Sequence, residues 1–209
     1  MFGFVLSMNK TISLKNLTKL YVKEGKSISE ISKLLGYSEN KINYWVDKYR
    51  ISKRSISEAL YLKHNPQGDP FEFMAPSRAE EWFLFGLGLG LYWGEGNKKN
   101  KTQVRLGNTD PHLIKSFLRF VDKVYKVEKR KIRFGLQIFS DMSPRQALSF
   151  WSTFLEVSPK QFGKVIVTPA RSIGTYRQKT KHGVLTIYIS NSKLRNILCD
   201  EIEKLSQVS

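Results

Sequence analysis

Cysteine is almost absent from this sequence, because Cys199 is the only one among 209 residues. A single thiol cannot form a disulfide within the chain or a zinc site made of cysteines, so neither can hold the fold together. Histidine is also scarce. His112 and His182 are expected far apart, at a helix start and in a loop, and we interpret neither as a metal ligand. This usage is typical of a reducing compartment, so we expect a cytoplasmic protein.

Long apolar runs are absent as well. The longest, from Trp82 to Trp93, covers twelve residues and includes three glycines, whereas a membrane-spanning helix needs about 20 apolar residues. The first ten residues, MFGFVLSMNK, have neither the basic start nor the small-residue cleavage site of a signal peptide. We therefore expect no membrane partner.

Acidic residues are outnumbered, since 18 Asp and Glu stand against 35 Lys and Arg and the formal net charge is +17. A surplus of this size repels itself in a compact fold unless a polyanion neutralises it. The charge is not confined to a tail, because residues 1–60 contribute +6 and the remainder +11. Both halves of the chain are therefore candidates for contact with nucleic-acid phosphates, and a nucleoid-associated location is expected.

The first fifty residues carry the signals of three helices. Apolar spacing predicts a first helix over residues 13–24. Ser27 and Glu30 have the spacing of a capping box, so a second helix should begin there and run to Leu35. Gly36 can adopt the left-handed conformation that closes a tight turn.

A third helix is predicted to begin at a Ser38 cap and to reach about residue 49. Ser32 is small and lies four residues before the turn glycine, where the second and third helices must approach closely. Their apolar residues should then face one another, with Ile31, Leu34 and Leu35 against Ile42, Trp45 and Val46.

This order of short helix, glycine turn and second helix resembles the helix-turn-helix modules of resolvases and of many bacterial regulators. In such modules the helix after the turn lies in the major groove, where Asn can bond adenine and Lys can reach guanine or phosphate. The alternative is an ordinary three-helix unit with a solvated polar face. The glycine turn and the basic segment KYRISKR that follows argue against this alternative. The candidate DNA-contacting residues are Ser38, Glu39, Asn40, Lys41, Asn43, Tyr44, Lys48, Lys53 and Arg54.

Residues 56–80 are predicted to link a helix-turn-helix domain at 1–55 to a larger domain at 81–209. The turn-forming segment NPQGDP and Pro76 interrupt this stretch. Its basic first part, with Lys63 and His64, either follows the phosphate backbone or is a solvated linker.

Three glycines form the most informative pattern of the larger domain. Gly86, Gly90 and Gly94 recur at every fourth position, so they should form a bare stripe along one helix. Each glycine costs about 1 kcal/mol relative to alanine inside a helix, and close approach of another helix backbone would offset this cost. Glu95 falls at the C-terminal end, where a carboxylate meets the negative end of the helix dipole.

Three other structures could contain such a glycine-rich segment. A nucleotide-binding loop needs G-x-G-x-x-G after a strand, and the third glycine is missing here. A membrane-embedded glycine dimer is excluded by length. A glycine-packed core helix stays open as an alternative, in which Glu95 is paired to Lys98 or Lys99.

Residues 88–96, GLGLYWGEG, resemble the LAGLIDADG motif of homing endonucleases and of their non-cutting regulatory relatives. The resemblance implies that two such helices pack face to face through small residues, with the acid of each at the centre of the DNA site as a ligand of a divalent metal. It assigns the dimer interface to Gly86, Gly90 and Gly94, the metal-binding and catalytic role to Glu95, and a catalytic polar role to Asn108. Because one motif occurs in the chain, it implies a homodimer.

The remaining sequence predicts strands and helices that suit an α+β fold, with a curved antiparallel sheet. Strands are expected at 103–108, 131–139, 164–170 and 184–190. Helices are expected from Asp110, which would be a cap, to about residue 125, from Ser143 to about Leu155, and from 191 or 192 to 205. The candidate DNA contacts are Lys98, Lys99, Arg105, Arg133, Gln137, Arg177, Lys179 and Lys181, beside the outward-facing Gln103, Thr186 and Tyr188.

The sequence departs from the family pattern in two ways. One strand, where the family usually has two, fits between the motif helix and the next helix, and the 143–155 helix looks like an addition. Cleaving members also tend to place a Lys near the end of the last strand, where this chain has Ile189, Ser190 and Asn191, with Lys193 beyond.

These observations predict a sequence-specific protein that binds double-stranded DNA, of the homing endonuclease lineage. If it cleaves, Mg²⁺ held by Glu95 would polarise the phosphate and activate water. The alternative is a catalytically inactive transcription regulator on the same scaffold. RNA binding is a third class of function, but the sequence contains no aromatic RNA-binding motif that would support it.

Overall fold

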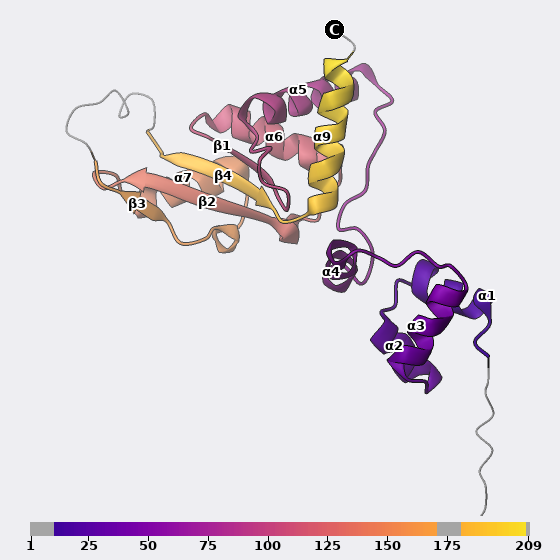
Figure 1. The fold of residues 1–209 in the computed structure, drawn as a ribbon. Coiled ribbons are helices and arrows are strands. Elements are labelled where there is room, and N and C mark those ends of the chain that lie inside the picture. The colour runs from indigo at the N-terminus through magenta and orange to yellow at the C-terminus, as the bar shows by residue number, and fades with distance from the viewer. Residues whose placement is uncertain (1–10, 171–180, 208–209) are drawn as a thin grey trace, which may run out of the picture. The chain divides into compact units, whose positions relative to one another are not determined.

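A computed structural model describes residues 11–170 and 181–207 of this chain and divides it into two compact units, Met1–Gly68 and Asp69–Ser209 (Figure 1). The division falls inside the linker predicted at 56–80. Residues 56–64 form a helix, whereas the end of the predicted linker belongs to the second unit. There, the backbone N–H groups of Glu72 and Met74 donate to the carbonyls of Tyr125 and Val124, at 2.9 and 2.7 Å.

The first unit is helical, and its caps are those that the sequence predicts. It consists of α1 (Leu14–Leu17), the π-helical η1 (Thr18–Lys23), α2 (Ile28–Leu35), α3 (Glu39–Lys48) and α4 (Ile56–His64). Ser27 and Glu30 form the predicted capping box at the start of α2, and the Ser38 hydroxyl accepts from the backbone N–H of Lys41 at the start of α3. Gly36 ends α2 with φ 70°, in the left-handed region.

A small core holds these helices together. Ile31 of α2 and both Ile42 and Val46 of α3 are fully buried, which confirms that the two helices face each other. Leu34 was wrongly expected in this contact, because its side chain is 60% exposed. At 100° per residue, Leu34 points to the opposite side of Ile31 from Leu35, which packs at the edge of the core.

The second unit is an α+β fold around a four-stranded sheet. Its elements are α5 (Ala79–Glu95), β1 (Val104–Asn108), α6 (Pro111–Lys123), η2 (Lys129–Lys131), β2 (Ile132–Phe139), α7 (Pro144–Leu155), η3 (Pro159–Gln161), β3 (Ile166–Thr168), β4 (Val184–Ile189) and α9 (Ser192–Ser206). The strand order is β1-β4-β2-β3. Asp110 and Ser143 cap α6 and α7, as the sequence predicts.

The sheet is mixed, which corrects the prediction of an antiparallel one. β4 pairs antiparallel with both β1 and β2, whereas β3 pairs parallel with β2. The reason is the 143–155 helix: the chain leaves β2, crosses through α7 and η3, and enters β3 from the same end. Such a crossover joins parallel strands, whereas a tight hairpin joins antiparallel ones.

Helices cover one face of this sheet, and α5, α6 and α9 lie together on that side in Figure 1. Side chains alternate along β2 between buried and accessible, so that Phe134 and Leu136 enter the core while Arg133 and Gln137 point away from it. α5 packs against α6 where Gly88 meets the ring of Phe120, and a Cβ at position 88 would lie 2.0 Å from that ring. Among the described residues, every helix is too short or too polar to span a lipid bilayer.

Candidate nucleic-acid interface

The outer face of the sheet presents polar and basic side chains in register across three strands. Tyr188 of β4 pairs with Arg105 of β1 on one side and with Arg133 of β2 on the other. The Arg105 guanidinium lies over the Tyr188 ring, 4.9 Å from its centroid, and Arg133 is exposed. The predicted outward direction of these residues is confirmed, and the strand register places one cation on each side of Tyr188.

Glycines keep the middle of this face shallow. Thr186 of β4 pairs with Gly107 of β1 and with Gly135 of β2, so one row across the sheet has a single short side chain. The Tyr188 side chain leans over Gly135, where an added Cβ would approach its ring to 2.7 Å. At the margins Gln137 donates to the Thr168 hydroxyl at 3.0 Å, and Gln103 to the Ser190 hydroxyl at 3.3 Å. The result is a low polar surface that can lie against a broad ligand.

The helix α3 offers a second polar surface, in the first unit. Asn40, Tyr44 and Lys48 recur at every fourth position and are exposed, with Lys41 and Asn43 half-exposed beside them. Lys48 extends over the Trp45 ring, 4.6 Å from its centroid. Glu39 is exposed in the first turn, whereas the Ser38 hydroxyl is occupied by its capping bond. The side chains predicted to read bases therefore share one accessible face of this helix.

Two basic residues after α3 are engaged within the unit. The Arg54 guanidinium donates to the carbonyls of Gly25 and Lys26 and lies 4.2 Å from the centroid of the Tyr21 ring. Lys53 pairs with Asp47, at 2.7 Å. Arg54 thus holds the turn between η1 and α2, and contact with phosphate would require it to leave those carbonyls.

Glu95 lies exposed at the last position of α5, and within the described part of the chain no ion pair engages it. The alternative pairing with Lys98 is not formed, because the Lys98 ammonium donates to the Trp93 carbonyl at the end of the helix. A cation therefore offsets the negative end of the α5 dipole without neutralising the carboxylate. Lys99 is exposed beside it.

Arg195 of α9 fixes the segment that follows Glu95, a role that the sequence did not suggest. This side chain is 8% exposed, and its guanidinium donates to the Lys98 carbonyl and to the Asn196 amide oxygen. Nearby, burial raises the pKa of Tyr92 to about 12. The position of the α5 C-terminus is thus set from α9, by a buried cation that holds a backbone carbonyl.

The predicted glycine stripe is bare. No described atom would lie within 4 Å of a Cβ added at Gly86, Gly90 or Gly94. The chain's own core therefore does not pack on this stripe, unlike Gly88 on the buried side of the same helix. Trp82 and Trp93 flank the stripe and are 57% and 48% exposed.

The other predicted catalytic residue has a local structural role. The Asn108 amide oxygen accepts from the backbone N–H groups of Thr109 and Asp110, at 2.7 and 3.0 Å. Lys193, the nearest lysine to the end of β4, pairs with Asp69 at 2.5 Å. Within residues 11–170 and 181–207, His, Cys, Asp and Glu side chains form no group of three that could hold a metal ion.

Of the remaining predicted contacts, Lys181 is exposed just before β4. Arg177 and Lys179 lie outside the described residues. Comparison with protein-family models, with curated proteins and with solved structures found no significant match.

Proposed function

We propose that this chain is a sequence-specific double-stranded DNA-binding protein that acts as a homodimer. The observation that carries the proposal is the outer face of the sheet. There Arg105 and Arg133 flank Tyr188, and the neighbouring row contains Gly107, Thr186 and Gly135. A shallow basic sheet suits the width of a duplex groove, and β-structures read DNA in this way. The net charge of +17 supplies the attraction to phosphate.

The exposed face of α3 supports base-specific contact by the first unit. Asn40 and Asn43 present amide groups of the kind that bond adenine in bidentate fashion. Lys48 is an exposed cation on the same helix and would contact phosphate. Phosphate contacts would position both units, whereas these amides would specify sequence.

The proposed dimer rests on the bare face of α5. At 100° per residue Trp82, Gly86, Gly90 and Trp93 fall on one side of the helix, so that two empty positions lie between two bulky ones there. A two-fold axis through this face would bring the tryptophans of one copy toward the glycines of the other. Burial of these rings and close backbone contact would offset the helix cost of three glycines, about 3 kcal/mol.

Selection of binding sites from a random duplex library tests this function. The wild-type chain should enrich a two-fold symmetric sequence. Asn40→Ala and Asn43→Ala should each relax the preference at one position of each half-site, at a cost of about 1–3 kcal/mol in binding free energy. Arg133→Ala should weaken binding to all sequences alike. Arg145→Ala, which removes an exposed cation from α7, is the matched control. An unselective pool from the wild-type chain would contradict sequence-specific binding.

Metal-dependent DNA cleavage is proposed as the activity on this scaffold if two copies bring their Glu95 carboxylates together. Each chain would contribute one carboxylate to such a site, since Glu95 is exposed and carries no ion pair among the described residues. Bound Mg²⁺ would supply Lewis-acid activation of the phosphate and of water. The protein's own contribution would be to hold the metal through Glu95 and to fix that helix end through Lys98 and Arg195.

A non-cleaving regulator is the second candidate, and it is favoured because Asn108 is engaged by neighbouring backbone N–H groups and Lys193 by Asp69. Glu95→Gln separates the two. In a nuclease this change should abolish Mg²⁺-dependent cutting of a selected site and leave binding nearly intact. In a regulator, the wild-type protein should not cut, and Glu95→Gln should melt slightly higher because it removes a charge from the negative end of the dipole.

A further inference from the structure

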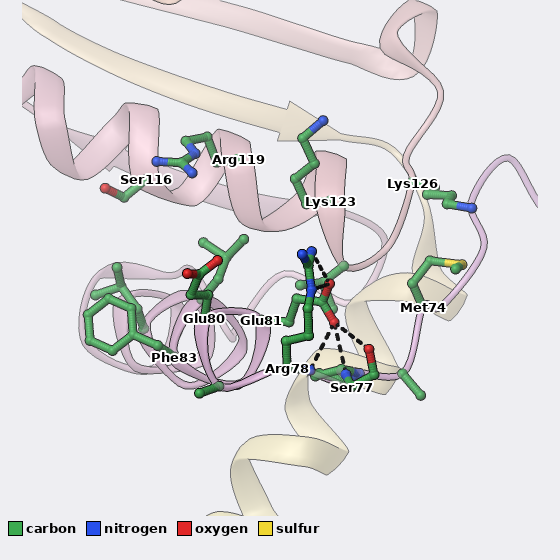
Figure 2. Close-up of a pocket in the computed structure, with 16 residues that line it drawn as sticks. Met74, Ser77, Arg78, Glu80, Glu81, Phe83, Ser116, Arg119, Lys123 and Lys126 are labelled. Atoms are coloured by element: carbon green, nitrogen blue, oxygen red, sulfur yellow. Dashed lines mark hydrogen bonds and ion pairs between the residues drawn. The ribbon is translucent and has the colours of Figure 1, made fainter.

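A cleft of about 850 Å³ opens between α5 and α6 (Figure 2), and none of the residues assigned to DNA lines it. Its walls are the N-terminal half of α5, the C-terminal half of α6 and the connecting strap of residues 74–78. α5 has 17 residues, so it is about 25 Å long at 1.5 Å per residue. The cleft lies beside the first half of this helix, whereas Glu95 is its last residue.

Small residues leave this space open. The Phe120 ring of α6 does not fill it, because it packs against Gly88 on the buried side of α5. The lining includes three small residues, Ser116 of α6, Ala79 of α5 and Ala75 of the strap. Phe83 and Met74 give it an apolar rim, and the Phe83 side chain is 72% exposed.

Positive charge gathers on the α6 side. Arg119 and Lys123 lie one helical turn apart on α6, and Lys126 follows the helix. Within the described part of the chain, no carboxylate pairs with Arg119. Lys123 pairs with Asp122 at 3.4 Å and Lys126 with Glu72 at 3.6 Å, and exposed pairs of this kind are weak and readily exchanged.

The two carboxylates of the lining have different roles. Glu81 accepts from the Ser77 backbone N–H and from the Arg78 guanidinium, and these bonds lower the pKa of Glu81 to about 2. Glu81 is therefore ionised, and its charge is balanced by Arg78. Glu80 points from α5 toward the α6 side, where Figure 2 shows its carboxylate, and can accept a hydrogen bond from a ligand. The cleft thus offers cations, one acceptor and an exposed aromatic ring.

We propose that this cleft binds a small nucleoside phosphate. Arg119 and Lys123 would hold the phosphate, because guanidinium and ammonium groups form strong charge-assisted hydrogen bonds to its oxygens. Glu80 would accept from ribose hydroxyls, and Phe83 would stack against the base. The site is separate from the proposed DNA surface and does not rest on it, so the ligand would be a second partner of the protein. At 100° per residue Phe83 falls on the side of α5 that carries Gly86 and Gly90, so the proposed dimer would border this cleft.

Titration calorimetry on the full chain tests this site, with adenosine 5′-monophosphate, adenosine and inorganic phosphate as three separate probes. The monophosphate should bind one per chain, and the other two at least about tenfold more weakly, since each carries half of the recognised chemistry. Arg119→Ala should weaken the monophosphate about tenfold or more, whereas Arg145→Ala, an equal charge change outside the cleft, should leave its affinity unchanged.

A filling variant makes the test independent of charge. Ser116→Leu should occupy the space between α5 and α6 and abolish binding of the monophosphate while the melting temperature and DNA affinity stay near wild type. Absence of monophosphate binding at millimolar concentration would overturn the proposal. Equal losses in Arg119→Ala and Arg145→Ala would overturn it as well, because they indicate general attraction to a basic surface. Inorganic phosphate binding as tightly as the monophosphate would overturn the assignment to a nucleoside phosphate.

Discussion

Two cationic side chains that were expected to face DNA donate to backbone carbonyls. Arg54 holds the carbonyls of Gly25 and Lys26 in the turn between η1 and α2, and Lys98 holds the carbonyl of Trp93 in the last turn of α5. Turn carbonyls and the last carbonyls of a helix lack partners within a helix, so a nearby cation satisfies them. The sequence marks these residues as basic but does not reveal which carbonyls come near them in the fold. For the same reason, the sequence does not predict that Arg195 is buried against the Lys98 carbonyl.

Arg54→Ala should lower the stability of the first unit by about 2 kcal/mol, because hydrogen bonds from a charged donor typically contribute about 1.5–3 kcal/mol. Lys53→Ala removes the adjacent cation and is the matched control. It breaks an exposed pair with Asp47, whose contribution should stay below about 1 kcal/mol. Hydrogen exchange of the amides in η1 and α2 measures both changes. Equal protection in the two variants would mean that Arg54 is free for another partner.

His182 should titrate below its ordinary range. Its ring stacks on Phe150 at 3.5 Å between centroids, and burial, with a smaller contribution from Lys181, lowers the pKa of His182 from 6.5. The folded protein then binds fewer protons than the unfolded chain. The stability linked to His182 is therefore fully present above about pH 6.5 and is lost as the pH falls through the folded-state pKa. NMR titration should give a value below 6.5 that rises toward it in Phe150→Ala, and a wild-type value above 6.5 would contradict this account.

At the scale of elements, local signals were predicted well and long-range pairing was not. The caps at Ser27, Ser38, Asp110 and Ser143 depend on residues two or three positions apart, so the sequence contains them in full. The parallel pairing of β3 depends on the path through α7, which alternation of apolar residues does not encode. The π-helical turn of η1 and the helix α4 were also not predicted. The glycine stripe was predicted, but the close contact of Gly88 with Phe120 was not.

The glycines of α5 should respond oppositely to the same small substitution. Gly88→Ala should destabilise the second unit by about 1–3 kcal/mol, because the new methyl group overlaps the Phe120 ring. Gly90→Ala places its methyl group in open space and should be neutral or stabilising by up to about 1 kcal/mol within one chain. Urea unfolding of both variants at low protein concentration measures the difference. Similar losses at both positions would mean that Gly90 also faces the core of its own chain.

Gly90→Leu tests the proposed dimer on the same helix. The larger side chain would hold apart two helices that approach through the stripe, so the dimer should dissociate while each chain stays folded. Light scattering measures the molar mass, and circular dichroism is the control for folding. A Gly90→Leu protein with the mass of the wild-type dimer would place the dimer interface elsewhere.

At the scale of the whole molecule, each unit carries its own candidate DNA surface. The first has the exposed face of α3, and the second has the outer face of the sheet with Arg105 and Arg133. The sequence located both surfaces because basic and polar side chains follow the periods of helix and strand there. It did not locate the cleft between α5 and α6, whose walls are residues far apart in the chain.

The salt dependence of affinity for duplex DNA measures whether the α3 face and the outer face of the sheet bind phosphates. If the two surfaces together neutralise six or more phosphates, the logarithm of the association constant should fall linearly with the logarithm of salt concentration. The loss should be roughly 10³-fold or more between about 50 and 200 mM salt. Fluorescence anisotropy with a labelled duplex, repeated with single-stranded DNA of the same length, measures this slope. A nearly flat dependence, or equal affinity for the single strand, would contradict binding of double-stranded DNA through these surfaces.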